Sequence, residues 1–353
     1  PQRADEFLAG RWSDPVMSSA EHLTDPREEA AFAAAVERHR AELQVHCYRM
    51  LGSFDDSEDL VQETFLRAWR RRASFSSDGS SSLRAWLYRI ATNACLDVLR
   101  RRPRRVLPQE VAPAGDPTAP PPPPADLPWL QPYPDRLLEP VAPAQDEPAA
   151  VSVARETIEL AFLAAIQHLP PRQRAVLLLR DVLGWSAKDM GSLLEASVAS
   201  VNSALQRARA TLRDHLPERR SDWAQPSGPS DEERELLRRY LDAHERTDVD
   251  ALAALLLEDA RLTMPPHATW YAGREAILVA SEQGFDPAFG ELRSVVAGAN
   301  LQPAAAHYLR PPGESQYRPL ALDVLRVEGG RVAEISSFVF PDLFPAFGLP
   351  PTL

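Results

Sequence analysis

The sequence predicts a multidomain protein whose first two thirds are all-α and whose last third is α+β. Apolar residues recur at three- and four-residue spacing through most of residues 30–216, which is typical of amphipathic helices. From about Arg261 onwards, short β-like runs separated by glycine and proline replace that spacing. A chain of 353 residues is also longer than one ordinary domain.

Composition divides the chain into five segments. A stretch that holds 14 of the 34 prolines separates two helical parts, and prolines exclude both a helix and a central strand there. We expect this linker to be extended; because its centre, Pro128–Asp135, carries two large aromatic residues, a docked linker and a free one are equally compatible with the sequence. The segments are a tail (1–29), a helical domain (30–105), the acidic linker (106–150), a second helical domain (151–220) and the α+β domain (229–353).

The local pattern predicts the elements within these segments. In the first helical domain the expected helices are Ala30–Leu51, a second that begins at Asp55–Ser57, and Leu83–Arg102, with a Ser/Gly-rich loop at Ser74–Ser82. In the last third, one or two helices between Asp231 and Glu258 precede the strands, and Glu328-Gly329-Gly330 is a hairpin signal. The expected strands are Arg261–Met264, Leu292–Val296, Ala305–Arg310, Leu320–Val327 and Val332–Phe340.

The net charge of −11 is unevenly distributed along the chain. Residues 30–105 carry a net +5 and residues 151–220 a net +3, whereas the linker carries −6 and residues 221–353 carry −9. Two basic segments flanked by acidic ones are expected when only part of a chain contacts phosphate. The acidic average therefore does not exclude a nucleic-acid-binding protein.

Other classes of protein are excluded by what the sequence lacks. It has no apolar run of about 18 residues that would span a membrane, and residues 1–10 lack the basic and apolar regions of a secretory signal. We expect a cytoplasmic protein whose two cysteines, Cys47 and Cys95, remain buried thiols. Two thiols do not make a zinc site, and no metal or cofactor is expected.

The pattern from Ser186 to Arg209 predicts a helix-turn-helix. A helix that starts at Pro171 ends at Gly184, Ser186 caps a short helix to Leu194, and a longer basic helix covers Val198–His215. Short helix, tight turn and long helix is the geometry that places a recognition helix in a major groove. A helical hairpin with a purely structural role is the alternative.

One turn residue departs from the usual pattern, and the long helix divides into two faces. Glu195 stands where glycine is preferred, which costs about 1 kcal/mol if its φ is positive. The apolar stripe comprises Val201, Leu205, Ala208 and Leu212. The opposite face offers candidate base readers (Asn202, Ser203, Gln206) and candidate phosphate partners (Arg207, Arg209, Arg213).

These residues also carry a family resemblance. Leu169-Pro170-Pro171-Arg172-Gln173-Arg174, with Gly184-Trp185-Ser186 and Arg207-Ala208-Arg209 after it, resembles region 4 of the extracytoplasmic-function (ECF) sigma factors. Asp59–Phe65 and Trp86–Asn93 resemble their region 2. The resemblance implies binding to core RNA polymerase, through the β′ clamp and the β subunit, and to promoter DNA. It also implies that the linker threads toward the polymerase active centre.

The resemblance assigns roles residue by residue. Gln62 and Glu63 match positions that contact the polymerase clamp, with a solvated helix face as the alternative, and Phe75 lies in the loop that receives a flipped-out base. Arg100–Arg105 is expected to clamp phosphate, with a merely solvated basic end as the alternative. The candidate contacts to the −10 element are Phe75, Asn93, Asp97 and Arg100, and those to the −35 element are the residues of the predicted recognition helix.

The last 120 residues resemble the SnoaL-like, NTF2-like cone, in which helices and a curved sheet enclose an apolar pocket. The candidate pocket residues are Met264, His267, Trp270, Tyr271, Tyr308 and Phe338, all of which are equally compatible with core positions. His267, Asp259, Arg261 and Asp323 are acid–base candidates, but spacing selects no pair among them. We expect no catalytic residues here, and either a small ligand or a regulatory docking role.

The sequence is therefore interpreted as a sigma factor with a fused C-terminal regulatory domain, and not as an enzyme. That domain is expected to pack on the helical domains or the linker; the motive is its net charge of −9, which is opposite to that of the two helical domains. Two alternatives remain: a helix-turn-helix regulator that acts without polymerase, and an NTF2-like enzyme with DNA-binding domains.

Overall fold

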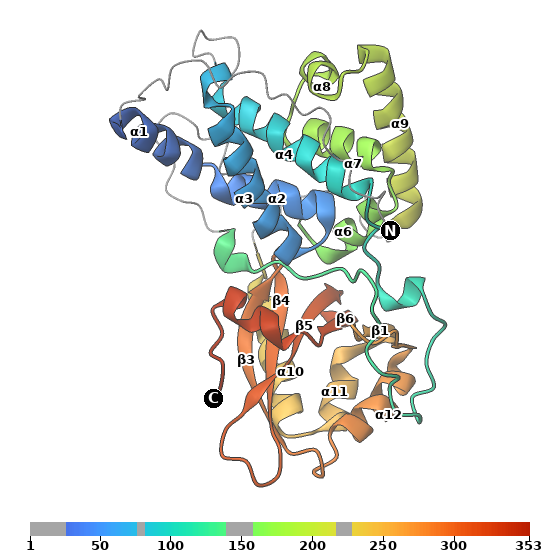
Figure 1. Cartoon of the computed structure of the whole chain (residues 1–353). Helices are drawn as coiled ribbons and strands as arrows, with labels where there is room; N and C mark the ends of the chain where they lie inside the picture. Colours follow the sequence, from blue (N-terminus) through green and yellow to red (C-terminus); the bar gives the residue numbers. More distant parts are fainter. Residues whose placement is uncertain (1–25, 76–81, 139–157, 217–227) are drawn as a thin grey trace, which may run out of the picture.

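The computed structural model describes residues 26–75, 82–138, 158–216 and 228–353. Figure 1 shows a helical half above a sheet half, with the linker passing between the two and continuing over the sheet half. Most of the predicted tail, most of the Ser74–Ser82 loop and linker residues 139–150 lie outside the described residues.

The first helical domain contains four helices. The expectation of one helix over Ala30–Leu51 is wrong, because the chain leaves helical geometry at His39, whose imidazole Nδ1 contacts Glu42 Oε1 at 2.6 Å in the first turn of the next helix. The helices are Pro26–Glu37 (α1), Arg40–Leu51 (α2), Phe54–Arg70 (α3) and Leu83–Leu99 (α4), with a 3-10 turn at Arg72–Ser74 (η1).

The second helical domain ends in the helix-turn-helix that the sequence predicts. Its first helices are Leu160–Gln167 (α6) and Pro171–Leu177 (α7), and a π-helical turn, Leu178–Val182 (η4), continues α7. Ala187–Leu194 (α8) and Val198–His215 (α9) follow. Serine side chains accept the orphan backbone N–H at the start of α3, α4, α8 and α9, and each such cap is worth about 1 kcal/mol.

The last third forms a six-stranded sheet with the strand order β2-β1-β6-β5-β4-β3. Only β1 and β6 pair in parallel; the other neighbours are antiparallel. The predicted strands are confirmed and β2 is added to them. The bounds are Leu256–Thr263 (β1), Trp270–Ala272 (β2), Glu291–Ala299 (β3), Gln302–Arg310 (β4), Arg318–Glu328 (β5) and Arg331–Phe338 (β6). The helices are Asp231–Glu245 (α10), Val249–Leu255 (α11) and Arg274–Gly284 (α12), with a 3-10 helix at Pro341–Phe347 (η5).

Alternation along the strands gives the sheet two different faces. Ala305 of β4 packs in one core with residues of α10, α11 and α12, whereas its neighbours Ala304 and Ala306 belong to the core that also contains the helical half. The predicted hairpin signal is confirmed, because Gly329 and Gly330 both have positive φ between β5 and β6.

A second hairpin joins the sheet to the helical half. Asn300 and Leu301, at φ 57° and 58°, form the two-residue turn between β3 and β4. The buried Asn300 amide donates to Tyr48 Oη of α2 (2.9 Å) and to the Ile158 carbonyl (2.7 Å). Its Oδ1 accepts from the backbone N–H of Tyr133 in the linker (2.8 Å). One side chain thus holds three segments that are far apart in the sequence.

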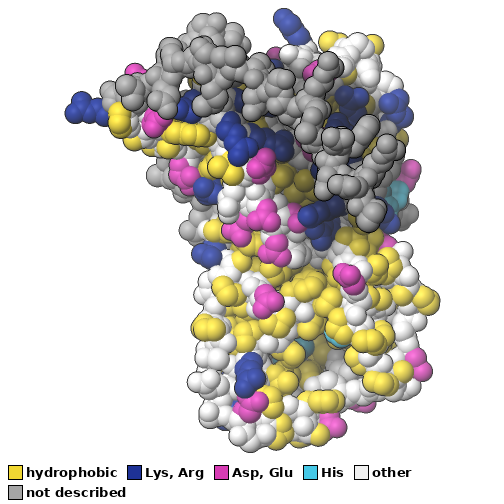
Figure 2. Space-filling view, in the orientation of Figure 1, with side chains coloured by type: hydrophobic (Ala, Val, Ile, Leu, Met, Phe, Trp, Pro, Cys, Tyr) yellow, Lys and Arg dark blue, Asp and Glu magenta, His cyan; other side chains and the backbone are white. Residues whose placement is uncertain are grey.

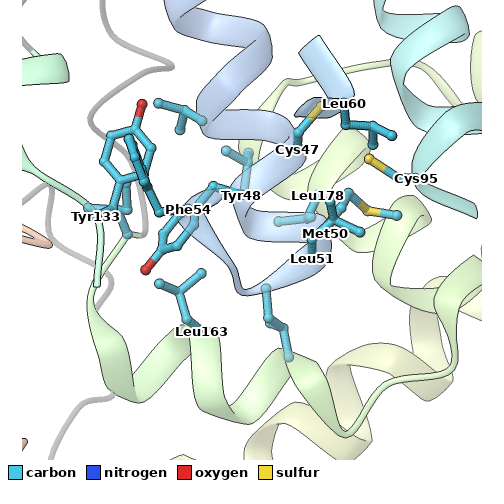
Figure 3. Packing of buried hydrophobic residues seen from close by; sticks show 14 of the residues in the cluster. Cys47, Tyr48, Met50, Leu51, Phe54, Leu60, Cys95, Tyr133, Leu163 and Leu178 are labelled. Carbon is cyan, nitrogen blue, oxygen red and sulfur yellow. The ribbon is translucent and has the colours of Figure 1, made fainter. Parts of the chain in front are cut away.

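Aromatic rings surround this junction. The ring centroids of Tyr48 and Tyr133 lie 4.8 Å apart, and those of Phe54 and Tyr133 lie 5.7 Å apart. Figure 3 shows these rings beside Cys47 and Cys95, which are both buried and both free thiols. The core therefore continues from the first helical domain through the linker.

Arg174 of α7 ties the two helical domains together. Its buried guanidinium donates to the Met50 carbonyl of α2, to Gln167 Oε1 (2.7 Å) and to the Gln167 carbonyl (2.9 Å). Burial lowers the pKa of Arg174 to about 10, so the group is still charged at neutral pH. A buried cation that bonds mainly to carbonyls contributes stability only while each of those bonds is made.

We expect Arg174→Leu to lower the free energy of unfolding by about 3 kcal/mol, because it leaves buried carbonyl oxygens without donors. Urea denaturation followed by circular dichroism would measure this. The control is Arg101→Leu, since Arg101 is exposed and its side chain forms no hydrogen bond or ion pair with a described residue; it should change stability by less than about 0.5 kcal/mol. Equal effects of the two substitutions would contradict the role assigned to Arg174.

Candidate nucleic-acid interface and C-terminal pocket

The helix-turn-helix closes through a glycine in its short helix. Glu195 has φ 52°, so the left-handed conformation that its position predicts is present. The chain turns so tightly that the backbone N–H of Ala196 donates to the Gly191 carbonyl at 2.9 Å. A Cβ on Gly191 would lie 2.7 Å from the Ala196 oxygen, which leaves no room for another residue. The sequence pattern drew attention to the turn position at Glu195, whereas the glycine that the turn requires is Gly191, four residues before it.

The recognition helix α9 presents its polar face to solvent. The predicted apolar stripe is buried, and Asn202 and Gln206 are exposed without a side-chain partner among the described residues. Ser203 is half-buried, and its Oγ accepts from Arg207 Nη1 at 2.6 Å. Two of the three candidate base readers are thus available to DNA, while the third is engaged within the helix.

The cations of α9 differ in their surroundings. Arg209 forms a bidentate pair with Asp181 of η4, with Nε 2.9 Å from Oδ2, and this hydrogen bond raises the pKa of Arg209. Arg213 is exposed and pairs with no described acid. Arg213 therefore offers an uncompensated charge to phosphate, and Arg209 offers one that Asp181 partly neutralises.

The region 2 candidates lie on exposed faces of α3 and α4. Gln62 is exposed, and Glu63 Oε1 accepts from Arg67 Nε at 2.7 Å. Arg67 also lies 3.6 Å from a carboxylate oxygen of Asp97, so an ion-paired chain connects the two helices. Asn93 is exposed beside this chain.

The basic end of α4 is largely paired within the protein. Arg100 donates to Asp97 at 2.8 Å. Arg102 and Arg105 both bond to Asp56 in the first turn of α3, and Arg104 bonds to Glu110 at 2.7 Å. Through Arg102 and Arg105 this cluster ties the end of α4 and the start of the linker to α3, and its role as a phosphate clamp stays a prediction.

Phe75 belongs to the described part of the expected base-receiving loop. Its half-buried ring lies 5.2 Å from that of Trp86, the first residue of the Trp86–Asn93 motif. Residues 76–81 of the loop lie outside the described residues. The ring pair gives a stacking platform of the kind that unpaired bases use.

The linker is docked, which decides between the two alternatives that the sequence left open. Trp129, Leu130 and Tyr133 are buried in the junction of the two halves. Further back, the Gly115 N–H donates to the Trp270 carbonyl (2.8 Å) and Trp270 Nε1 donates to the Ala112 carbonyl (2.9 Å).

A second set of bonds continues this attachment along the proline run. The Ala125 N–H donates to the Pro266 carbonyl at 2.8 Å, and His267 Nδ1 lies 2.7 Å from the Pro122 carbonyl. Trp270 and His267 thus hold the linker and are absent from the lining of the pocket that we predicted for them. The extended proline backbone presents its carbonyls outward, which explains why side chains of the C-terminal domain find acceptors there.

The C-terminal domain contains a cavity of about 420 Å³ between the sheet and its helices. Met264 and Tyr271 line it, as predicted. Tyr308 and Phe338 do not, because strand alternation turns them to the opposite face, where Tyr308 packs 5.2 Å from the ring of Phe344. In Figure 2, histidine atoms are visible within the apolar surface of this half.

A polar cluster forms one end of the cavity. His307 Nε2 lies 3.0 Å from Asp323 Oδ2, and Tyr240 Oη donates to the same oxygen at 2.6 Å. Burial tends to raise the pKa of Asp323, but His307 and His244 outweigh it and hold that pKa below its usual range. Of this cluster the sequence identified Asp323 alone; Asp259 and Arg261, the other candidates on β1, do not join it.

The residues that sequence reasoning missed come from two elements. Tyr240 and His244 are one helical turn apart on α10, and His307 lies on β4, which pairs directly with β5, the strand that carries Asp323. The i, i+4 spacing of Tyr240 and His244 is a usable signal, but nothing in the sequence pairs that helix with those strands. His244, His307 and Asp323 each offer a potential metal ligand atom, and these atoms lie within 4.8 Å of one another.

Comparison with known proteins identifies the family. The Sigma-70 region 2 model matches residues 35–105, the Sigma-70, region 4 model matches 159–212, and the SnoaL-like domain model matches 237–335. The ECF RNA polymerase sigma factor SigG of Mycobacterium tuberculosis (strain H37Rv) is 44% identical over 358 residues, covering 100% of this chain and 93% of SigG. The chain belongs to the ECF RNA polymerase sigma factors.

Two further sigma factors are similar to this one over different shares of the chain. SigE of Mycolicibacterium smegmatis, another ECF RNA polymerase sigma factor, is 30% identical over 193 residues, which are 54% of this chain and 63% of SigE. The crystal structure of the M. tuberculosis extracytoplasmic function sigma factor SigJ superposes with a TM-score of 0.56 at 20% identity, covering 91% of this chain and all of SigJ. The fold of SigJ is therefore shared across both halves.

The family decides between the functional alternatives in favour of a sigma factor, and the resemblance that we inferred from the motifs is confirmed. Among the described helices of this sigma factor, none has the length and apolarity required to cross a membrane. The contacts assigned to individual side chains stay predictions.

We expect the stability of this sigma factor to fall as the pH drops from about 6.5 toward 4. Burial lowers the pKa of His244 to about 4 and that of His46 to about 3, so the unfolded chain binds protons that the folded chain refuses. Stability is therefore full above the unfolded pKa and is lost below it. The urea midpoint at pH 5.0 should lie clearly below that at pH 7.5, and His244→Phe should reduce the difference. A midpoint that is equal at both pH values would contradict this.

Proposed function

We propose that this sigma factor binds core RNA polymerase and directs transcription initiation at promoters with separate −10 and −35 elements. We further propose that its C-terminal domain restrains this activity by holding both DNA-binding domains and the linker in one closed arrangement. The observation that carries the proposal is the Asn300 junction, which joins the sheet, the linker and region 2 through buried hydrogen bonds.

The domain boundaries that we propose are those of the sequence analysis. Region 2 is assigned to residues 30–105, the linker to 106–150, region 4 to 151–220 and the regulatory domain to 229–353, after a tail at 1–29. The protein needs no catalytic residue of its own in this role, because the polymerase supplies the chemistry. We therefore infer that it is not an enzyme and that it acts in the cytoplasm.

The −35 element is assigned to α9. Asn202 and Gln206 are exposed amide side chains one turn apart, and such amides can form two hydrogen bonds with the edge of adenine. Ser203 is assigned beside them. Arg207, Arg209 and Arg213 are assigned to phosphates, which fix the register of the helix on DNA without reading sequence.

The −10 element and the polymerase are assigned to region 2. Asn93, Asp97 and Arg100 share one side of α4, and Phe75 with Trp86 offers a surface on which an unpaired base can stack. Gln62 and Glu63 of α3 are assigned to the polymerase clamp. Figure 2 supports a nucleic-acid role for this half, since arginine and lysine side chains gather on it and are few on the sheet half in this view.

In the closed arrangement, the two DNA-binding domains lie too close together to bind both promoter elements at once. The Arg89 guanidinium of α4 lies 3.5 Å from Ser192 Oγ of α8, so the helix assigned to the −10 element touches the helix-turn-helix. Two elements about 25 base pairs apart are separated by roughly 85 Å of duplex. Helices of 17 and 18 residues are each only about 26 Å long, so both elements can be bound together only after the two domains separate.

The docked linker opposes that separation. It is buried at the junction and bonded along the C-terminal domain, so opening the arrangement breaks contacts to Asn300, Trp270 and His267. The exposed face of α9 is not covered by the C-terminal domain. Restraint of domain spacing is therefore the mechanism that we propose, in place of direct occlusion of the recognition helix.

We expect Asn202→Ala and Gln206→Ala to weaken binding to the cognate promoter by about 10-fold or more while leaving binding to unrelated duplex DNA almost unchanged. Arg213→Ala should weaken binding to both and reduce the slope of log affinity against log salt by about one. Fluorescence anisotropy over a salt series, with polymerase present, measures both effects. The assignment fails if the amide substitutions weaken both DNAs equally.

We expect Asn300→Ala to raise promoter-specific transcription at limiting core polymerase several-fold, because it removes the side-chain hydrogen bonds that hold the closed arrangement. The matched control is Val296→Ala on β3, the strand that leads into this turn, since Val296 is 61% exposed. In vitro transcription with full-length chains and purified core enzyme compares them. Unchanged or lower transcription by a folded Asn300→Ala variant would rule out restraint by this junction.

A further inference from the structure

The cavity of the C-terminal domain has the dimensions of a ligand site. Its volume of about 420 Å³ falls within the range of roughly 300–1,000 Å³ that small-molecule pockets occupy. Most of its wall is apolar, with contributions from both sheet and helices. The apolar lining includes Leu252, Leu262, Met264, Ile277, Leu292 and Ile335.

The polar end of the cavity offers acceptors. His244 Nδ1 lies 2.9 Å from the carbonyl of Tyr240, which can only accept, so this nitrogen carries the proton. With the proton on Nδ1, the neutral imidazole of His244 carries a lone pair on its Nε2. Among the described residues, none donates a hydrogen bond to that nitrogen.

Asp323 adds a second acceptor. Its Oδ2 accepts from Tyr240 Oη and lies 3.0 Å from His307 Nε2. Its Oδ1 is buried and makes no well-aligned hydrogen bond with a described residue; the side chain of Ser337, which also lines the cavity, helps to lower the pKa of this carboxylate but leaves that oxygen without an aligned donor. A buried carboxylate oxygen without a donor is costly, and proteins usually satisfy such atoms. An occupant that brings a donor would satisfy it.

The linker forms part of the cavity wall. Pro120 and Pro121 line the cavity beside residues of α12. Bonds on both sides fix this stretch: Gln283 Nε2 of α12 donates to the Pro117 carbonyl at 2.9 Å, and the Ala125 N–H donates to the Pro266 carbonyl. A molecule in the cavity therefore contacts the linker only when the linker is docked.

We propose that this cavity binds a largely apolar small molecule that carries a hydroxyl group, and that its occupancy holds the linker against the C-terminal domain. The hydroxyl donates to His244 Nε2 or Asp323 Oδ1. The apolar body of the ligand packs against the apolar residues that line the cavity, among them Leu262 and Leu292. The binding half stands independently of the proposed function, whereas its effect on transcription rests on the closed arrangement described above.

Binding of a ligand in the cavity and docking of the linker are thermodynamically linked. A ligand that contacts Pro120 and Pro121 binds the docked state better than the released state, so it shifts the population toward docking. By reciprocity, anything that releases the linker lowers the affinity for the ligand by the same factor. The ligand thus favours the docked linker and core polymerase favours the released linker, so each weakens binding of the other although they do not share a binding surface.

The test uses the full-length chain and two probes that differ in one donor. By isothermal titration calorimetry, 2-naphthol should bind at least about 10-fold more tightly than 2-methoxynaphthalene, which has the same rings but no hydroxyl proton. His244→Phe should reduce that preference, and Leu262→Trp, which fills the cavity, should remove binding of both probes. Val296→Ala is the surface control and should change neither affinity.

Several outcomes would overturn the binding site. These are no binding of either probe to the wild-type chain, equal affinities for the two probes, and binding of 2-naphthol that Leu262→Trp leaves intact in a variant with a normal unfolding temperature. Tight binding of Zn²⁺ at the three ligand residues with no binding of 2-naphthol would also overturn it, in favour of a metal site.

Hydrogen exchange tests the linker half separately. Saturating 2-naphthol should slow exchange of the Gly115 and Ala125 amides several-fold, and 2-methoxynaphthalene should do so less at equal concentration. Unchanged exchange would refute coupling to the linker while leaving the binding result in place. If binding and slowed exchange both occur but 2-naphthol does not lower transcription, then restraint of activity by the closed arrangement is what fails.

Discussion

The buried amide of Asn300 is the contact on which the arrangement of this sigma factor depends. It donates to Tyr48 in region 2 and to the carbonyl of Ile158, and it accepts from Tyr133 in the linker. An amide can serve all of these partners because it carries donors and an acceptor in one plane. The turn conformation that presents it, with φ 57° at Asn300 and 58° at Leu301, is unfavourable for leucine, so the junction must supply the stability that the turn lacks.

The same junction explains how a DNA-binding protein can keep its recognition helix exposed and still be restrained. Asn202 and Gln206 of α9 face solvent, but α8, the other helix of the helix-turn-helix, contacts α4. Promoter recognition by two domains requires a fixed distance along the duplex, so any contact that shortens that distance weakens binding at both elements together. The energy of the closed arrangement comes from a few buried hydrogen bonds, three aromatic rings and the apolar core that one face of the sheet shares with the helical half.

The proline-rich linker takes part both in the restraint of the DNA-binding domains and in the wall of the C-terminal cavity. The side chains of Trp270 and His267 contact backbone carbonyls of the linker, and Pro120 and Pro121 of the linker form part of the cavity wall. A rigid, extended proline chain suits this purpose, because it loses little conformational entropy on docking and offers regularly spaced carbonyls. An occupant of the cavity and the position of the linker are then parts of one equilibrium.

The sequence by itself determined the elements and the family. Helical spacing, serine caps and the motifs around Arg172 and Trp86 predict regions 2 and 4, because those signals are local and repeat within a few residues. Tertiary structure alone decided which distant residues meet: His307 beside Asp323, Asn300 against Tyr48, and the linker against Trp270. Such pairs depend on strand register and on how a loop docks, and neither leaves a periodic trace in the chain. The fold of each part, and the expectation that the C-terminal domain packs on the others, could therefore be predicted from the sequence, whereas the contacts that hold the closed arrangement could not.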